Sequence, residues 1–433
     1  MTARRLCMKQ LIPPFSASAV TALFVLAPAL ACTQQSLTWD QVKAKFEAGN
    51  PALRADADNV DEMRAEEVTA YLRPNPQLTV TADGTQIAPG HGVWEPLAGT
   101  FVSPSVSYLH ERDHKRELRL ESAREGTRIS EAEHDDLKRT MEFTLRAAFV
   151  QTLEAKTVLD MAKSDLDYYD KIIAINHDRF RAGDIAEIDM DRIELLRVQY
   201  ESELQTAIVN LRTAKIQLLQ FLNDRTPVEQ FDVTGPFDFS ETLQPLDDFR
   251  QMALDARPDL QAALQAAQQA VTNHKLAEAN GSTDPTLAAW YTWNASTNNP
   301  DATQTLGLSV SVPLRIFDRN QGERQRTQID IDRSQQTAQA ARAQVFSDVD
   351  TAYAQVQSNI ELLKPYKAKY NDEALHVRDT VTYSYEHGGA SLMDFLNAQS
   401  DYREVQLAYT ELIGAYLTAA GQLNLAVGRE VIP

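Results

Sequence analysis

The sequence predicts a mainly α chain with a small β part, built from one structural repeat that occurs twice. Each repeat is expected to run helix, strand, strand, long helix, turn, long helix. Three residues recur in both halves at a constant offset of 205 positions, namely an aromatic, a glycine and an aspartate (Phe180 and Tyr385, Gly183 and Gly388, Asp189 and Asp394). Glycine and proline are sparse, at 16 and 18 of 433 residues, which favours long helices over a compact α/β fold with many turns.

Residues 1–31 are typical of an export signal, because basic residues precede a mostly apolar run that ends in Ala-Leu-Ala. Cys32 follows at once and resembles the cleavage site of bacterial lipoproteins, so we expect lipid attachment at Cys32. The alternative is ordinary cleavage after Ala31, with Cys32 there by chance. Cys7, the other cysteine, lies inside the signal, so the exported chain cannot form an internal disulfide.

Composition excludes two classes of function. The formal net charge is −19 and the chain contains no block of basic residues, so nucleic acid is not an expected partner. No glycine-rich phosphate-binding motif occurs, so any energy for transport would have to come from partner proteins. Beyond the signal there is no apolar run of about 18 residues, the length that a transmembrane helix needs.

The first repeat is expected over residues 32–225. Apolar residues alternate with small or polar ones at about 77–84 and at about 101–108, which predicts two strands. A helical hairpin should follow at about 117–223, because its first arm contains no proline and a single glycine. The tip of this hairpin is placed near 181–186.

A proline-rich linker is expected at 226–245, and the second repeat follows at 246–433. Arg257-Pro258 stands in it where Asn50-Pro51 stands in the first repeat. The stretch from Gln325 to Tyr383 is expected to be long and helical. The other predicted elements of this repeat are strands at about 286–293 and 305–313 and a helical hairpin at about 323–428 with its tip near 384–390.

Strands of this alternating kind in an exported protein suit a membrane barrel with one face toward lipid and one toward water. Four strands cannot close a barrel, and open sheet edges are not viable in a bilayer. Three chains would supply twelve strands, enough for an aqueous bore. The helices, about 95 Å long for the first arm, would continue the barrel as a tube. The rival interpretation is a soluble coiled-coil protein with a small β domain.

The run from Gly307 through Pro313 to Gly322 resembles the strand-to-helix corner of the TolC-like outer-membrane factors, and of their heavy-metal efflux branch in particular. The first repeat lacks this run. The resemblance implies a homotrimer in the outer membrane, with a 12-stranded barrel in contact with lipid and a periplasmic α-helical tube. It also implies a periplasmic adaptor protein and an inner-membrane efflux pump of the RND type as partners. The cargo would be small solutes such as divalent metal ions or drugs.

The same resemblance implies two kinds of site. Asp394 and Asn397 would form the periplasmic gate, where three carboxylates around an axis repel one another, have some pKa values raised and attract cations. Alternatively, Asp394 only begins its helix, where acidic residues are favoured. The adaptor-docking tips would include four residues near the repeated glycines: Arg179, Gly183, Tyr385 and Gly388. The glycines are also expected to allow a left-handed turn.

His110 to His114 match the H-E-x-x-H pattern of zinc peptidases. That chemistry needs the pattern inside a helix and a third ligand downstream, whereas here it follows a predicted strand. We therefore expect no catalytic residues, no metal site and no cofactor, which leaves a secreted metallopeptidase as a distant interpretation. The sequence predicts a passive outer-membrane export conduit. The alternative is a periplasmic coiled-coil adaptor or scaffold without a pore.

Overall fold

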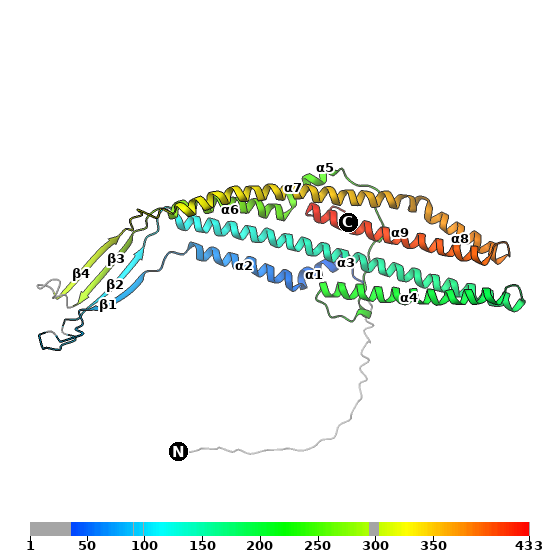
Figure 1. The fold of residues 1–433 in the computed structure, drawn as a ribbon, viewed down its shortest axis with the longest axis horizontal. Coiled ribbons are helices and arrows are strands. Elements are labelled where there is room, and N and C mark those ends of the chain that lie inside the picture. The colour runs from blue at the N-terminus through cyan, green and yellow to red at the C-terminus, as the bar shows by residue number, and fades with distance from the viewer. Residues whose placement is uncertain (1–35, 90, 98, 294–302, 433) are drawn as a thin grey trace, which may run out of the picture. The chain divides into compact units, whose positions relative to one another are not determined.

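The computed structural model describes residues 36–432 except 90, 98 and 294–302 (Figure 1). The predicted export signal and Cys32 lie outside the described residues. In the part of the chain that is described, no helix is both long and apolar enough to span a bilayer.

The first repeat contains four helices and two strands, with the element order that the sequence predicts. They are α1 (Trp39–Gly49), α2 (Pro51–Tyr71), β1 (Gln77–Asp83), β2 (Phe101–Leu109), α3 (Lys115–Ala182) and α4 (Glu187–Phe221). The connection to the second repeat holds a short 3₁₀ turn, η1 (Val228–Gln230). Within this connection Val233 forms a parallel bridge with Leu37, so the segment is tied back to the start of the first repeat.

The second repeat has the same order. Its elements are α5 (Leu246–Ala256), α6 (Pro258–Asn280), β3 (Thr286–Trp293), β4 (Gln304–Ser311), α7 (Gln321–Pro365), η3 (Tyr366–Tyr370), α8 (Asn371–Glu386) and α9 (Leu392–Val427). The fold class, mainly helical with a small sheet, is confirmed.

One long helical stretch contains a local irregularity. The run from Gln325 to Tyr383 is divided by η3, a π-helical turn that begins directly after Pro365. Proline has no backbone N–H to donate and its ring crowds the preceding turn, so a local change of helical pitch is the expected response. The stretch is helical as expected, but the sequence analysis did not consider Pro365 and did not predict the π-helical turn.

One side-chain hydrogen bond occurs at equivalent positions in both repeats. Asn50 begins α2 by accepting from the backbone N–H groups of Ala52 and Leu53, and its Nδ2 donates to the carbonyl of Phe221 at 3.1 Å. In the second repeat Arg257 donates to the carbonyl of Ala426 at 3.3 Å, and Ala426 lies 205 positions after Phe221. In both repeats, the residue before the proline thus holds the last turn of the last helix.

The four strands form one antiparallel sheet in the order β1-β2-β3-β4. The central pair joins the two repeats, because β2 pairs with β3 along the register that places Ser105 opposite Trp290. The outer pairs place Val80 opposite Pro104 and Trp290 opposite Gly307. This register fixes which side chains share a face of the sheet.

Three separate clusters of buried apolar residues hold the helices together. One joins α1, α3 and α4 of the first repeat around Phe46, Leu145 and Leu218. Another joins α5, α7 and α9 of the second repeat around Phe249, Val349 and Leu423. The third packs the two hairpin tips against each other and contains Tyr169, Ile172, Ile193, Tyr385, Leu392 and Phe395.

Candidate functional site

One face of the sheet is apolar and lies open. The register places on it a continuous set of apolar side chains from all four strands: Leu78, Val80, Val102, Val106, Leu287, Ala289, Tyr291, Trp293, Leu306, Leu308 and Val310. Many of these side chains are half exposed or more, and Leu308 is 77% exposed. An exposed apolar surface of this extent marks a contact with lipid or with another protein.

The opposite face carries small polar residues. Between the ends of the strands it holds serines and threonines for the most part: Thr79, Thr81, Ser103, Ser105, Ser107, Thr292, Thr305 and Ser309. Some of them bond across strands, as Ser103 Oγ does with Thr292 Oγ1 at 2.7 Å. A sheet with one lipid-compatible and one water-compatible face is the arrangement of a transmembrane barrel wall.

Both edges of this sheet are open. In the described residues β1 pairs only with β2, and β4 pairs only with β3. Unpaired backbone groups along an edge cannot remain so inside a bilayer, since water is absent there. Such a sheet could lie in a bilayer only if further strands paired with both of its edges.

The strand-to-helix corners are fixed by buried polar contacts. The Lys115 side chain at the start of α3 is 3% exposed, and its ammonium bonds Asp284, which precedes β3. In the second repeat Asn320 donates from Nδ2 to the carbonyl of Ala277 on α6 at 2.7 Å. One corner thus holds the connection from α6 to β3, and the other holds the last turn of α6.

The H-E-x-x-H residues lie at the first of these corners and outside any helix. Asp113 and His114 have positive φ values of 54° and 57°, and His114 immediately precedes α3. The carboxylate of Glu111 accepts both guanidinium nitrogens of Arg119, at 2.5 and 2.9 Å. A peptidase would need this carboxylate beside a metal-bound water, whereas here it holds the corner.

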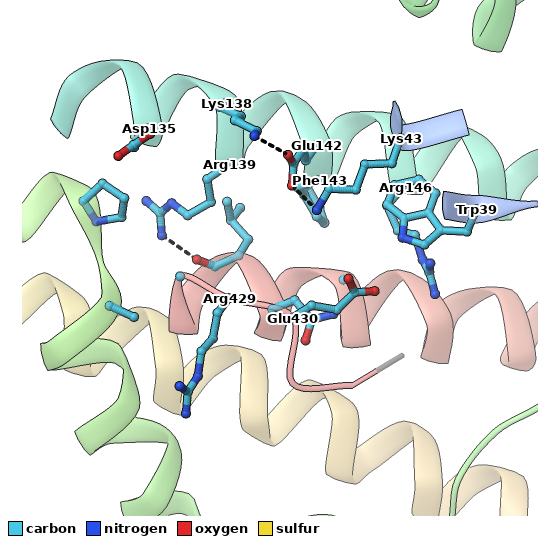
Figure 2. A pocket seen from close by; sticks show the side chains of 16 residues that line it. Trp39, Lys43, Asp135, Lys138, Arg139, Glu142, Phe143, Arg146, Arg429 and Glu430 are labelled. Atoms are coloured by element: carbon cyan, nitrogen blue, oxygen red, sulfur yellow. Dashed lines mark hydrogen bonds and ion pairs between the residues drawn. The ribbon is translucent and has the colours of Figure 1, made fainter. Parts of the chain in front are cut away.

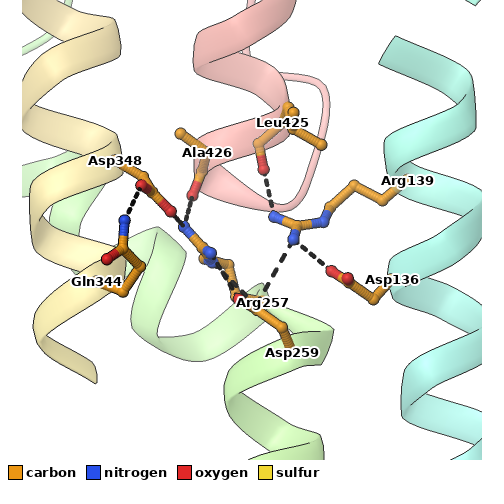
Figure 3. A network of polar contacts seen from close by, with 8 residues as sticks. All are labelled: Asp136, Arg139, Arg257, Asp259, Gln344, Asp348, Leu425 and Ala426. Carbon is orange, nitrogen blue, oxygen red and sulfur yellow. Dashed lines mark hydrogen bonds and ion pairs between the residues drawn. The ribbon is translucent and has the colours of Figure 1, made fainter. Parts of the chain in front are cut away.

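Two arginines join the repeats where the helices α3, α6, α7 and α9 approach one another (Figure 3). Arg257 bonds Asp259 at 2.6 and 3.0 Å and Asp348 at 2.8 Å. Arg139 donates to the carbonyl of Leu425 and forms an ion pair with Asp259 at 3.6 Å. Sequence analysis recorded Arg257 only as part of a repeated pair and did not foresee this network.

A cavity of about 470 Å³ lies beside this network, between α1, α3 and the end of α9 (Figure 2). Lys43 pairs with Glu142 at 2.9 Å, while Arg146 lies over the ring of Trp39 at 4.6 Å. Burial raises the pKa of Glu142 and lowers that of Arg146. The cavity is lined by both signs of charge and by both repeats, so it marks the joint between them.

The repeated glycines form the hairpin tips with the expected geometry. Gly183 and Gly388 have φ values of +85° and +77°, a region that side chains other than glycine enter at a cost. Asp184 N–H donates back to Arg179 O at 2.9 Å, and Gly389 N–H donates to Ser384 O at 2.7 Å. These bonds close each helix end in a tight turn.

The two tips pack against each other through Tyr385. Its ring stacks on Phe395 at 4.9 Å, and the guanidinium of Arg179 lies 4.9 Å from its centroid. Its hydroxyl donates to Asn176 at 2.7 Å. Because Tyr385 is only 5% exposed, it holds the tips together and offers little surface to a partner. Tyr383, which sequence analysis did not select, is exposed there instead.

Asp394 and Asn397 are both exposed and share one face of α9, as their spacing predicts. In the single chain the Asp394 carboxylate accepts from the hydroxyl of Ser391 at 2.7 Å and from its N–H at 3.1 Å. Hydrogen bonds from Ser391 hold the pKa of Asp394 below its usual range. Asp394 thus caps α9, and this role is compatible with a second one in an assembly.

Comparisons with known proteins agree with this architecture. Residues 249–429, most of the second repeat, match the model of the family described as "Outer membrane efflux protein". The cobalt-zinc-cadmium resistance protein CzcC of Cupriavidus metallidurans is 22% identical over 406 residues, which are 91% of this chain and 90% of that protein.

Solved outer-membrane channels have the same fold. CusC superposes with a TM-score of 0.75 and 17% identity, over 90% of this chain and 92% of that chain. OprN gives a TM-score of 0.74 with 15% identity, over 90% and 89%. The channel MtrE of Neisseria gonorrhoeae gives 0.72 with 18% identity, over 91% and 89%. The second repeat thus matches the outer-membrane efflux protein family, and the chain as a whole has the fold of a TolC-like outer-membrane channel.

Proposed function

We propose that three copies of this chain form a 12-stranded barrel and a tube of helices, which together make a passive export duct without catalytic activity. The tube would receive solutes from an inner-membrane pump of the RND type through a periplasmic adaptor protein. Cys32, once lipidated, would add an anchor in the membrane. Like the cobalt-zinc-cadmium resistance relative, this chain would serve divalent metal cations.

One observation carries this proposal, namely the two-faced sheet with both edges open. Closing those edges with identical sheets places the apolar face toward lipid and the serine and threonine face toward a bore. A soluble adaptor or scaffold leaves the apolar face unexplained. The test is fractionation followed by gel analysis. A heat-modifiable trimer in outer membranes that conducts ions in planar bilayers supports the duct, and a monomer in the soluble extract contradicts it.

The exposed side of α9 supports a cationic cargo. Carboxylates follow Asp394 along this side at heptad spacing, at positions 401, 404 and 411. Among the described residues none of these four carboxylates has an ion-pair partner within 4.0 Å. The whole chain has a formal net charge of −19. A line of carboxylates without ion-pair partners in so acidic a protein would concentrate cations along the duct.

The gate proposal can be separated from the capping role of Asp394. Replacing Asp394 by alanine should raise single-channel conductance and weaken block by divalent cations, because the carboxylates of the ring disappear. Ser391→Ala is the matched control, since it removes the same cap but leaves the carboxylate in place. Conductance and block are measured for both variants. Equal behaviour of the two variants would reduce Asp394 to a helix cap.

Docking at the tips can be tested at Gly388, beside which the structure has open space for a side chain. Gly388→Leu should abolish metal resistance in cells while trimers still form, because the leucine both strains the positive-φ turn and covers the tip. Gly388→Asn is the control, since asparagine tolerates this backbone conformation better than leucine. Resistance and crosslinked trimer are measured together. Loss of the trimer as well would mean that Gly388 is only structural.

A further inference from the structure

Trp290 is an unusual residue on the polar face of the sheet. It lies near the middle of β3, where its cross-strand partners are Ser105 on one side and Gly307 on the other. Apart from Phe101 and Leu109 at the two ends of β2, the other residues of this face are small or polar. Trp290 is therefore the one large aromatic side chain of this face, among the described residues, that lies away from the strand ends.

Gly307 allows the indole to lie against this wall. A Cβ atom at position 307 would overlap the ring atoms Cε2 and Cζ2 of Trp290. Because any other residue would push the ring away, the Trp290–Gly307 pair places the indole over β4. Trp290 is partly exposed, so part of the ring remains accessible from the space in front of this face.

An exposed indole face attracts cations through its quadrupole, and it also offers a flat apolar surface. Organic cations use both properties because they shed little water on contact. A divalent metal ion keeps its tightly held hydration shell and gains much less. In the proposed trimer three such faces would line the bore at one height, inside an acidic protein that concentrates cations.

We propose that Trp290, laid over Gly307, is a binding site for organic cations on the inner wall of the barrel. This inference rests on the proposed function, because only the closed barrel turns this face toward a bore. The site would bind organic cations as they pass through the duct, whereas hydrated metal ions would pass without binding there.

The test uses the purified trimer in planar bilayers, with tetraphenylphosphonium added on the side of the barrel as the probe. Trp290→Leu should weaken block by this cation about two- to fivefold and leave the conductance of zinc ions unchanged. Trp293→Leu is the matched control, since Trp293 lies on the same strand but on the apolar face. Tetraphenylphosphonium should block this variant as strongly as it blocks the unmodified protein. Gly307→Ala should weaken block as well, because it displaces the ring without removing it.

The outcomes separate the two proposals. Unmodified protein that forms no channels contradicts the proposed duct itself. Channels that are blocked equally well with and without Trp290 overturn the binding site and leave the duct intact. Equal loss of block from Trp293→Leu also overturns it. If Trp290→Leu does not assemble, Trp290→Phe and Gly307→Ala decide, and undiminished block in both contradicts the site.

Discussion

Replacing Arg257 by alanine should lower the free energy of unfolding by about 3–5 kcal/mol. The Arg257 side chain is 4% exposed and its bonds reach Asp259, Asp348 and the carbonyl of Ala426. Removing the guanidinium leaves Asp348 without its arginine partner and leaves Asp259 with only the more distant Arg139, at the point where four helices meet. Since domains are stable by only about 5–15 kcal/mol, the loss would be a large share. Urea unfolding of detergent-solubilised protein, followed by circular dichroism, measures it.

Arg250 provides the matched control. It lies on α5, seven positions earlier, and contacts Asp350 with two nitrogens at 2.8 Å each. This pair lies at the surface, where water screens both charges, so Arg250→Ala should change stability far less. A similar loss of unfolding free energy in the two variants would show that the buried Arg257 network stabilises the protein no more than a surface ion pair does.

The same network predicts a dependence on pH. Burial alone would raise the pKa of Asp259, but its bonds with Arg257 outweigh burial and hold that pKa below the usual range. The stability that this carboxylate contributes is therefore complete above its unfolded pKa, about 3.9, and is lost as pH falls through the lower folded value. In Arg257→Ala, mainly Arg139 opposes the burial of Asp259, so the folded pKa of Asp259 should rise toward its unfolded value. The part of the stability that is lost on acidification should therefore be smaller in the variant than in the unmodified protein.

The repeat could be predicted because it depends on local signals. Alternation marks the four strands, and the spaced glycines mark the tips at Gly183 and Gly388. The π-helical turn after Pro365 was missed because a single proline within a long helical pattern does not indicate whether the helix ends there or continues with a changed pitch. The Arg257 network and the inward placement of Tyr385 join segments about 90 to 210 positions apart, and no local pattern indicates such pairings. The serine and threonine face of the sheet could be predicted only in part. Alternation along each strand predicts two faces, but only the register of the strands shows that Trp290 lies opposite Gly307.

Replacing Leu308 by arginine should prevent stable assembly in the membrane. Leu308 lies on the apolar face of β4 and is 77% exposed in the single chain. An arginine at a lipid-facing position near the bilayer midplane costs about 2–4 kcal/mol in each chain, and a trimer would carry three. The fraction of heat-modifiable trimer in outer membranes measures the effect, and it should fall to a small part of the unmodified level.

Ser309→Arg is the control for Leu308→Arg, because it adds the same side chain to the next residue of β4. Successive residues of a strand point to opposite faces, so this arginine would lie on the water-compatible face. Assembly of Ser309→Arg should stay near normal, while its conductance changes because a charge enters the bore. If Ser309→Arg blocked assembly and Leu308→Arg did not, the faces would be assigned the wrong way round. If both assembled normally, the sheet would not be in contact with lipid, because a bilayer distinguishes the two faces and water does not.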